Sequence, residues 1–186
     1  MIIGKRITIR PMEPDDLDYL MEWRNSAGSM NYSEHLYGFL FSRDNMMRLV
    51  ENQFRESGFY PSSKTFIVEA EDGTVIGDIG YKNWDPRNRT VEIGLEIGVP
   101  EYRSKGYGTE MVALFVEYMF RNLNINRIEL SVLRENEQAI HLYEKLNFKA
   151  CGYRREAIFN SRLNRYSDIL MMDLLRPEWE KTLPSE

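Results

Sequence analysis

The stretch that decides the fold covers residues 90–110 and reads TVEIGLEIGVPEYRSKGYGTE. Its odd positions up to 99 are apolar, and its even positions from 92 to 98 are only glutamate or glycine. Side chains of a strand alternate between the two faces of a sheet, so this pattern predicts a strand over Thr90–Val99. One face packs on the core, and the other is bare apart from Glu92 and Glu96. Glycines inside a strand often mark close approach by a ligand, although a surface strand with a bulge would also contain them.

A glycine-rich turn follows this strand and leads into a helix. Pro100 ends the strand, Arg103–Thr109 forms the turn, and apolar residues at helical spacing predict a helix over Tyr107–Asn122. Such a turn offers unpaired N–H groups and the positive end of the helix dipole, which together suit a phosphate group. A P-loop needs Gly-Lys-Ser/Thr, but the order here is Lys105-Gly106, and a dinucleotide-binding loop needs a glycine where Pro100 stands.

A third informative segment covers residues 136–148 and reads NEQAIHLYEKLNF. Its spacing predicts a short helix, Asn136–Lys145, that presents Ala139, Tyr143 and Leu146 on one face. A tyrosine in such a position is more often a half-buried core residue than a catalyst, so the spacing by itself favours a structural role for Tyr143.

The order of the predicted elements indicates the fold class. Meandering strands come first, and a single β-α-β crossover lies in the second half of the chain. This order predicts a mixed α+β sheet with helices rather than a doubly wound nucleotide-binding fold. Without a linker in the sequence, residues 1–176 are expected to form one domain, followed by a polar tail over residues 177–186. The other predicted strands are Arg6–Arg10, Lys64–Glu71, Thr74–Trp84, Arg127–Leu133, Phe148–Phe159 and Asn164–Leu175. Two further helices are predicted, one that begins at Pro14 and one over Arg43–Glu56. The stretch Asn25–Phe41 between them is predicted to be a loop that could cover a site.

The composition is that of an ordinary globular protein and excludes several classes. The 186 residues are 42% hydrophobic and 28% charged, without an apolar run suited to a transmembrane helix or a secretory signal. Cys151 is the only cysteine, and His35 and His141 are the only histidines, which excludes an internal disulfide and a Cys-rich or His-rich metal site. These features predict a cytoplasmic protein. The net charge of −5 argues against non-specific nucleic-acid binding, which needs a basic surface.

Negative charge is concentrated in the first third of the chain. Residues 13–57 hold nine acidic residues and four arginines, a charge of −5, while the rest of the chain is neutral. Charge patterning favours a solvated face of two helices as the explanation. The alternative is a site entrance that attracts a cationic substrate.

Taken together, these segments resemble the GNAT N-acetyltransferase superfamily, which uses acetyl-CoA. The resemblance runs from RITIRP at residues 6–11 to DILM at residues 168–171, and its most specific parts are EYRSKGYGTE at 101–110, NEQAI at 136–140 and YEKLNF at 143–148. It is closest to the branch of ribosomal-protein N-terminal acetyltransferases and spermidine acetyltransferases. That family implies a central, mostly antiparallel seven-stranded sheet with flanking helices. This sequence departs from it at Asn147 and Ser104, where glycine is usual or common, and in a strand one residue longer, which affects the register of the glutamates.

The resemblance implies direct attack of a primary amine on the thioester of acetyl-CoA in a ternary complex, without a metal. It puts the pyrophosphate at the N–H groups of the glycine-rich turn and the pantetheine arm beside the strand end, where the arm pairs like an extra strand. A backbone N–H of that strand could polarise the thioester carbonyl. The implied cofactor-binding residues are Ile97, Gly98, Val99, Arg103, Ser104, Lys105, Gly106, Tyr107, Gly108, Thr109, Asn136, Ala139, Tyr143 and Lys145.

Proton transfer determines the candidate catalytic residues. A lysine-like amine has a pKa of about 10.4, so presenting it neutral at pH 7 costs about 4.6 kcal/mol. A carboxylate acting through water can take this proton, and Glu92 is the first candidate and Glu96 the second, because both lie on the bare face. By resemblance, Tyr143 matches the family's acid, which protonates the departing thiolate.

The acceptor is open at this stage. A small cationic amine such as a polyamine fits the acidic first third of the chain, and a protein N-terminus or lysine is the runner-up. A non-catalytic acyl-CoA-binding module on the same fold is an alternative of another class, against which Tyr143, Asn136 and the two glutamates argue. Neither nucleic acid nor membrane is an expected partner, and the exposed last strands favour a homodimer.

Overall fold

The computed structural model describes residues 1–26, 40, 42–55, 61–160 and 163–184. The loop predicted over Asn25–Phe41 therefore lies almost wholly outside the described residues. In chain order the elements are β1 (Ile2–Ile3), β2 (Ile7–Pro11), the 3-10 turn η1 (Pro14–Asp16), α1 (Leu17–Asn25), α2 (Arg43–Arg55), β3 (Lys64–Ala70), β4 (Val75–Asp85), β5 (Thr90–Ile97), the 3-10 turn η3 (Pro100–Tyr102), α3 (Tyr107–Arg121), β6 (Arg127–Leu133), α4 (Glu137–Lys145), β7 (Lys149–Asn160), β8 (Arg165–Leu175) and α5 (Arg176–Glu180).

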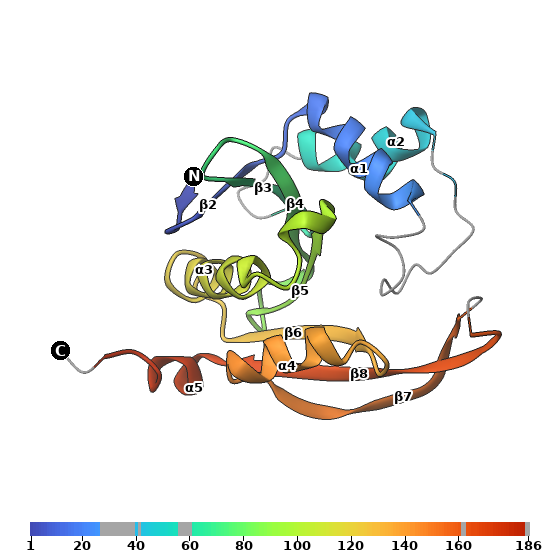
Figure 1. Cartoon of the computed structure of the whole chain (residues 1–186). Helices are drawn as coiled ribbons and strands as arrows, with labels where there is room; N and C mark the ends of the chain where they lie inside the picture. The colour runs from blue at the N-terminus through green and yellow to red at the C-terminus, as the bar shows by residue number, and fades with distance from the viewer. Residues whose placement is uncertain (27–39, 41, 56–60, 161–162, 185–186) are drawn as a thin grey trace.

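The strands of the described residues form one eight-stranded sheet in the order β1-β2-β3-β4-β5-β6-β8-β7 (Figure 1). Every neighbouring pair is antiparallel except β5 and β6, which α3 connects as the single β-α-β crossover. The predicted mixed, mostly antiparallel sheet is confirmed. It has one strand more than expected, because β1 is only two residues long and too short for its alternation to be recognised.

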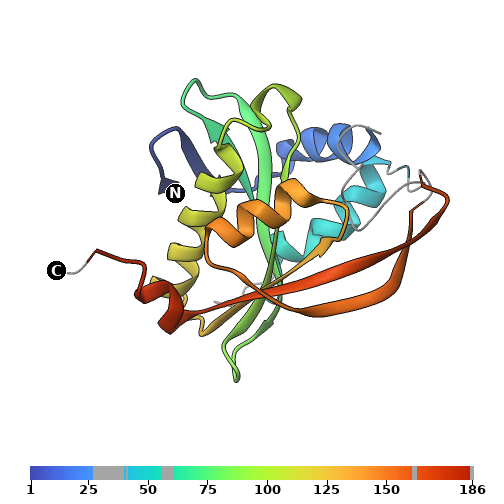
Figure 2. The same cartoon turned by 60° about the horizontal axis from the view of Figure 1, so that its bottom comes forward.

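Helices cover both faces of the sheet (Figures 1 and 2). On one face, Met111, Phe115 and Met119 of α3 are fully buried against the strands, and α4 adds the buried Tyr143 to the same cluster. On the opposite face, α1 and α2 pack over the half of the sheet that contains β3 and β4, with Trp23 among the buried residues. Two separate hydrophobic layers thus enclose the middle of the sheet.

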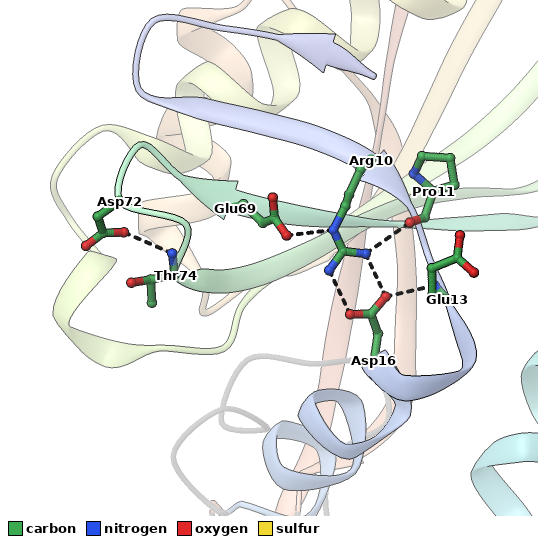
Figure 3. Close-up of polar contacts among 7 residues, drawn as sticks. All are labelled: Arg10, Pro11, Glu13, Asp16, Glu69, Asp72 and Thr74. Carbon is green, nitrogen blue, oxygen red and sulfur yellow. Dashed lines mark hydrogen bonds and ion pairs between the residues drawn. The ribbon is translucent and has the colours of Figure 1, made fainter.

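Local turn and cap signals in the sequence are confirmed. Gly73 has the left-handed φ of 83° that the Asp-Gly hairpin requires, and the Thr74 amide donates to the Asp72 carboxylate at 3.0 Å (Figure 3). The Asn45 amide donates to the Ser42 hydroxyl at 3.2 Å at the start of α2. The observed ends of the helices and strands lie close to the predicted ones because these signals are local.

Arg10 ties β2 to the start of α1 (Figure 3). Its guanidinium donates to both carboxylate oxygens of Asp16 at 2.7 and 2.8 Å and to Glu69 of β3 at 2.6 Å. Burial alone would raise the pKa of Asp16, but hydrogen bonds from Arg10 and the Glu13 amide outweigh it and hold that pKa below its ordinary value. Asp16 therefore stabilises the fold as an anion.

β7 and β8 form a long hairpin at the bottom of the view in Figure 1, and its far end extends beyond α4 and α5. β7 is an edge strand, and its first eight residues are exposed. Large aromatic side chains are also exposed on this hairpin, with Tyr153 at 53%, Phe159 at 47% and Tyr166 at 60%. Within the described part of the chain, the outer edge of β7 pairs with no other strand, so the hairpin offers a free edge and apolar surface together.

The segment expected to be a polar tail over residues 177–186 begins inside a helix. α5 spans Arg176–Glu180, with Pro177 in its first turn, and the Trp179 ring packs on the Phe120 ring with centroids 5.2 Å apart. The sequence signal that could have predicted α5 is Pro177 followed by Glu178, because proline and an acidic residue are both favoured in the first turn of a helix. Among the described helices, none has the length and apolar character needed to cross a membrane.

Candidate active site

The one parallel pair of strands separates after three residues. β5 and β6 pair only over residues 90–92 and 127–129, whereas β5 stays paired with β4 to Ile97 and β6 stays paired with β8 to Leu133. The sheet therefore splits toward the carboxyl ends of these two strands, and the turns that lead into α3 and α4 begin there (Figure 1). In open sheets, ligands bind at such strand ends.

β5 keeps its register along the split and then bulges. Its pairing with β4 runs without a shift from residue 92 to residue 97, so the two glutamates share one face as predicted. Beyond that point, the amides of Gly98 and Val99 both donate to the Ile76 carbonyl, at 2.9 and 3.3 Å. Two amides on one carbonyl form a β-bulge, so the strand predicted to reach Val99 ends at Ile97.

Only part of the predicted bare face is open. A side chain added at Gly94 would have no atom within 4 Å, whereas one added at Gly98 would lie 2.0 Å from the Trp23 ring. α1 therefore rests directly on the end of β5, and glycine at position 98 is what allows this approach.

The glycine-rich turn has the backbone geometry of an anion site. Ser104 and Gly106 have left-handed φ values of 59° and 86°, and Gly106 is the N-cap of α3. N–H groups around such residues converge on one side of the chain, and the first amides of a helix have no partner within it. The N–H groups of residues 104–109 can therefore hold a phosphate. The Arg103 amide differs, because it already donates to the Pro100 carbonyl at 3.0 Å.

Three side chains hold this turn in place. Arg103 donates to the two carbonyls at the end of β5, at 2.8 and 3.3 Å. Gln138 of α4 donates to the Ser104 hydroxyl at 3.0 Å, which joins the two helix starts. Arg6 donates to the Lys105 carbonyl at 3.0 Å. Sequence reasoning missed Arg6 because it lies 99 residues away from its partner.

α4 contributes Asn136 and Tyr143 near the split. The Asn136 carboxamide caps the helix by accepting from the Ala139 amide at 3.1 Å. Tyr143 is only 6% exposed, and its ring packs edge-to-face on Phe148 with centroids 5.7 Å apart. Lys145 is exposed at the other end of α4. It lies about 12 Å along the helix axis from the capped end.

Glu92 is held by three neighbours. Lys82 lies 3.2 Å from one carboxylate oxygen, and the Ser131 hydroxyl donates to the same oxygen at 3.2 Å. The side-chain amide of Asn83 donates to the other oxygen at 3.0 Å. Both oxygens thus have partners within the protein, which fix the orientation of the Glu92 carboxylate.

Glu96 is half-buried beside a carboxyl group that sequence analysis did not single out. Asp78 of β4 is directly opposite Glu96 in the antiparallel ladder, so both side chains lie on the face that α1 covers. Burial raises the pKa of Asp78 above its ordinary value, and Arg24 of α1, 3.8 Å away, opposes this rise only in part. The sequence signal that could have singled out Asp78 is its position inside an otherwise apolar stretch at residues 76–79.

Ion pairs within the protein neutralise part of the acidic first third. Asp16 is bound by Arg10, and Asp18 pairs with Arg43. Glu34 and Glu56 lie outside the described residues.

Among the residues that the structure describes, no three His, Cys, Asp or Glu side chains cluster in a way that could hold a metal ion. The expectation that no metal takes part stays a prediction.

A split sheet with an anion-binding turn at one strand end and carboxylates beside it is the arrangement expected of an acyl-CoA-dependent acetyltransferase. Comparison with known families agrees. The family model described as "Acetyltransferase (GNAT) domain" matches residues 6–149, and the chain belongs to this family of acetyltransferases.

Individual relatives support the branch that the sequence resembles. The spermidine N(1)-acetyltransferase of Escherichia coli (strain K12) is 32% identical over 148 residues, covering 78% of this chain and 74% of the relative. A putative ribosomal N-acetyltransferase of Bacillus subtilis (strain 168) is 27% identical over 185 residues, covering 96% of each. The crystal structure of spermidine N-acetyltransferase from Vibrio cholerae in complex with CoA and spermine is similar, with a TM-score of 0.84 and 26% identity, covering 95% of this chain and 99% of that chain.

Proposed function

We propose that this chain transfers the acetyl group of acetyl-CoA to a primary amine of a small, cationic, polyamine-like acceptor. The observation that carries the proposal is the split between β5 and β6, with an anion-binding turn at its end. The acceptor class is supported by the V. cholerae relative, which was solved with CoA and spermine and matches 95% of this chain. The charge of −5 over residues 13–57 favours a cationic acceptor as well.

In this proposal the pyrophosphate of acetyl-CoA lies on the N–H groups of residues 104–109. The pantetheine arm lies along the edge of β5 that faces the split, where no described strand pairs beyond residue 92. An amide-bearing arm can pair with such an edge as an added strand would. Asn136 and Ala139, in the first turn of α4, lie at the same end of the split, and Lys145 lies exposed at the other end of that helix.

The edge of β5 also supplies donors for the thioester carbonyl. The amides of Gly98 and Val99 are already bonded to Ile76. The donors that remain are amides of β5 before the bulge that face the split. A fixed N–H at this point stabilises the oxyanion that forms when the amine attacks.

Glu96 is the better-supported proton acceptor, and Glu92 is the alternative. Glu92 is held by three partners, whereas Glu96 lies four residues closer to the bulge, near the proposed position of the thioester. Replacement of each by glutamine separates them. Glu96→Gln should lower kcat by about 10²–10⁴, and Glu92→Gln should lower it less. The opposite ranking would make Glu92 the base.

Tyr143 is the proposed acid. The neutral amine forms a bond to the carbonyl carbon, the C–S bond breaks as the tetrahedral intermediate collapses, and the second amine proton leaves to water. The departing sulfur takes a proton from the Tyr143 hydroxyl, which recovers one from water. A position that is 6% exposed holds the ring firmly enough for this transfer.

A panel of acceptors tests the proposed function. Release of CoA thiol would be measured with spermine, spermidine, a neutral monoamine and peptides with free N-termini. We expect kcat/KM for the polyamines to exceed the others by at least tenfold. Faster reaction with peptides would favour protein N-terminal acetylation, as the name of the B. subtilis relative suggests. Tight CoA binding without thiol release would indicate a non-catalytic acyl-CoA-binding module.

We also propose a homodimer that works in the cytoplasm. The unpaired edge of β7, with Tyr153 and Phe159 exposed, supports pairing between copies, because long edges are otherwise protected. The single cysteine, Cys151, is exposed, which fits a reducing compartment. Sedimentation at micromolar concentration tests the dimer, and a monomer there would contradict it.

A further inference from the structure

Asp78 is a buried carboxyl group that the reaction proposed above does not use. The residue is 7% exposed, its Oδ2 atom is fully buried, and no described residue donates a hydrogen bond to that oxygen. A buried charge without hydrogen bonds is unstable, so such a group either meets a cation or carries a proton. The raised pKa of Asp78 agrees with this expectation.

The described elements around Asp78 bring two charged groups to it. Arg24 of α1 lies 3.8 Å from Oδ1 and also contacts the Met46 sulfur of α2 at 3.6 Å. On β3, the residue opposite Asp78 is Ile67, which is apolar and fully buried. On β5, the residue opposite is Glu96. Side chains placed opposite each other in an antiparallel pair have their Cβ atoms about 4.5–5.5 Å apart.

Two carboxyl groups that lie opposite each other on one covered face disfavour each other's ionisation. When both are ionised, their mutual repulsion increases the proton affinity of the pair. Arg24 limits the increase because its positive charge stabilises the doubly ionised form. The pair is therefore a stronger base than a single carboxylate, and the positive charge of Arg24 reduces its base strength.

We infer that Asp78 is a positioning residue that acts through Glu96, so that the two carboxyl groups together form one proton-accepting pair for the acceptor ammonium. This inference rests on the proposed function. One N–H bond of the ammonium breaks, the proton passes to Glu96 directly or through one water, and it is shared with Asp78. The neutral amine remains, and the proton later leaves to solvent. A lone glutamate has a pKa near 4.3 and the ammonium donor has a pKa of about 10.4, so proton transfer between them is strongly unfavourable. A stronger base narrows this difference in pKa and makes the transfer easier.

The dependence of kcat/KM for spermine on pH tests the inference. In Asp78→Asn, a second carboxylate no longer opposes the ionisation of Glu96, so the acidic limb of the profile should move down by at least one unit. On the acidic limb, kcat/KM changes about tenfold per pH unit. With a shift of one unit, the ratio of the variant's kcat/KM to that of the wild type should therefore be about tenfold larger on the limb than on the plateau. Arg24→Gln should move the limb in the opposite direction.

A matched control is Asp85→Asn, the same substitution at the far end of β4. No step of the proposed reaction uses Asp85. Its carboxylate accepts from the backbone amides of Arg87 and Asn88 at 2.9 Å and from the Asn88 side-chain amide at 2.6 Å. An asparagine oxygen keeps the two backbone contacts, and only the exposed side-chain contact is lost. The pH profile of this variant should coincide with that of the wild type. Melting temperature and CoA affinity, measured for every variant, would show which of them are folded.

A second readout does not depend on activity. Infrared difference spectra between acidic and alkaline pH should contain a protonated-carboxyl band that persists to higher pH than that of an ordinary carboxyl group and is missing in Asp78→Asn. A constant ratio of Asp78→Asn to wild-type kcat/KM at all pH values, without that band, would assign Asp78 a structural role and overturn the inference. A wild type that acetylates no amine would instead contradict the proposed function, and the infrared band would still decide whether Asp78 holds a proton.

Discussion

Gly106→Ala is the sharpest perturbation of the cofactor site. Gly106 has a φ of 86°, and an alanine in this left-handed region costs about 1–2 kcal/mol. The added Cβ would also lie 3.3 Å from the Arg6 guanidinium, which holds the turn. The turn can escape the strain only by rotating its amides away from the anion site. We therefore expect CoA to bind about 5- to 30-fold more weakly, the factor that corresponds to 1–2 kcal/mol.

Calorimetric titration with CoA measures this loss, and Gly73→Ala is the matched control. Gly73 has a similar φ of 83°, and a Cβ there would have no atom within 4 Å. The control should lose the same 1–2 kcal/mol of stability, about 2–8 °C in Tm for a chain of this length, with unchanged CoA affinity. A folded Gly106→Ala protein whose CoA affinity lies within twofold of the wild type would refute the phosphate assignment.

Three further predictions concern the acid, the acceptor and the fold. Tyr143→Phe keeps the ring packing, so kcat should fall about 10²–10⁴ with CoA affinity unchanged, and a variant that retains half its kcat would exclude the acid role if chemistry limits turnover. Raising salt should increase KM for spermine more than KM for acetyl-CoA, because salt screens the charge of residues 13–57 over about 8 Å. Asp16→Asn should lower the free energy of unfolding by about 3 kcal/mol. Because the folded-state pKa of Asp16 is lowered, this contribution is complete above the unfolded pKa of about 3.9 and is lost as pH falls further, so wild type and variant should converge in acid.

Features set by neighbouring residues could be predicted from the sequence. The alternation along β5 placed Glu92 and Glu96 on one face, and the pairing with β4 bears this out. The glycine-rich turn could be recognised because left-handed backbone conformations demand glycine or a small polar residue, as at Gly106 and Ser104.

Features set by distant residues could not be predicted in this way. The cover that Trp23 gives to Gly98, the contact of Arg6 with the turn, and the burial of Asp78 beside Arg24 all join segments far apart in the chain. Nothing in the local pattern indicates which cation will meet which carboxylate, because that depends on how α1 packs on the sheet. The bulge at the end of β5 was an open alternative for the same reason, since it depends on the hydrogen bonds that β4 offers.

The most direct test of acetyl transfer at the split sheet follows the acetyl group itself. Spermine would be incubated with the protein and acetyl-CoA carrying an isotopically labelled acetyl group, and both spermine and the protein would be examined by mass spectrometry. Direct attack in a ternary complex predicts that the label appears on a spermine nitrogen in step with CoA release, with none held covalently by the protein. Label trapped on the protein during turnover, or CoA release without labelled spermine, would contradict the account.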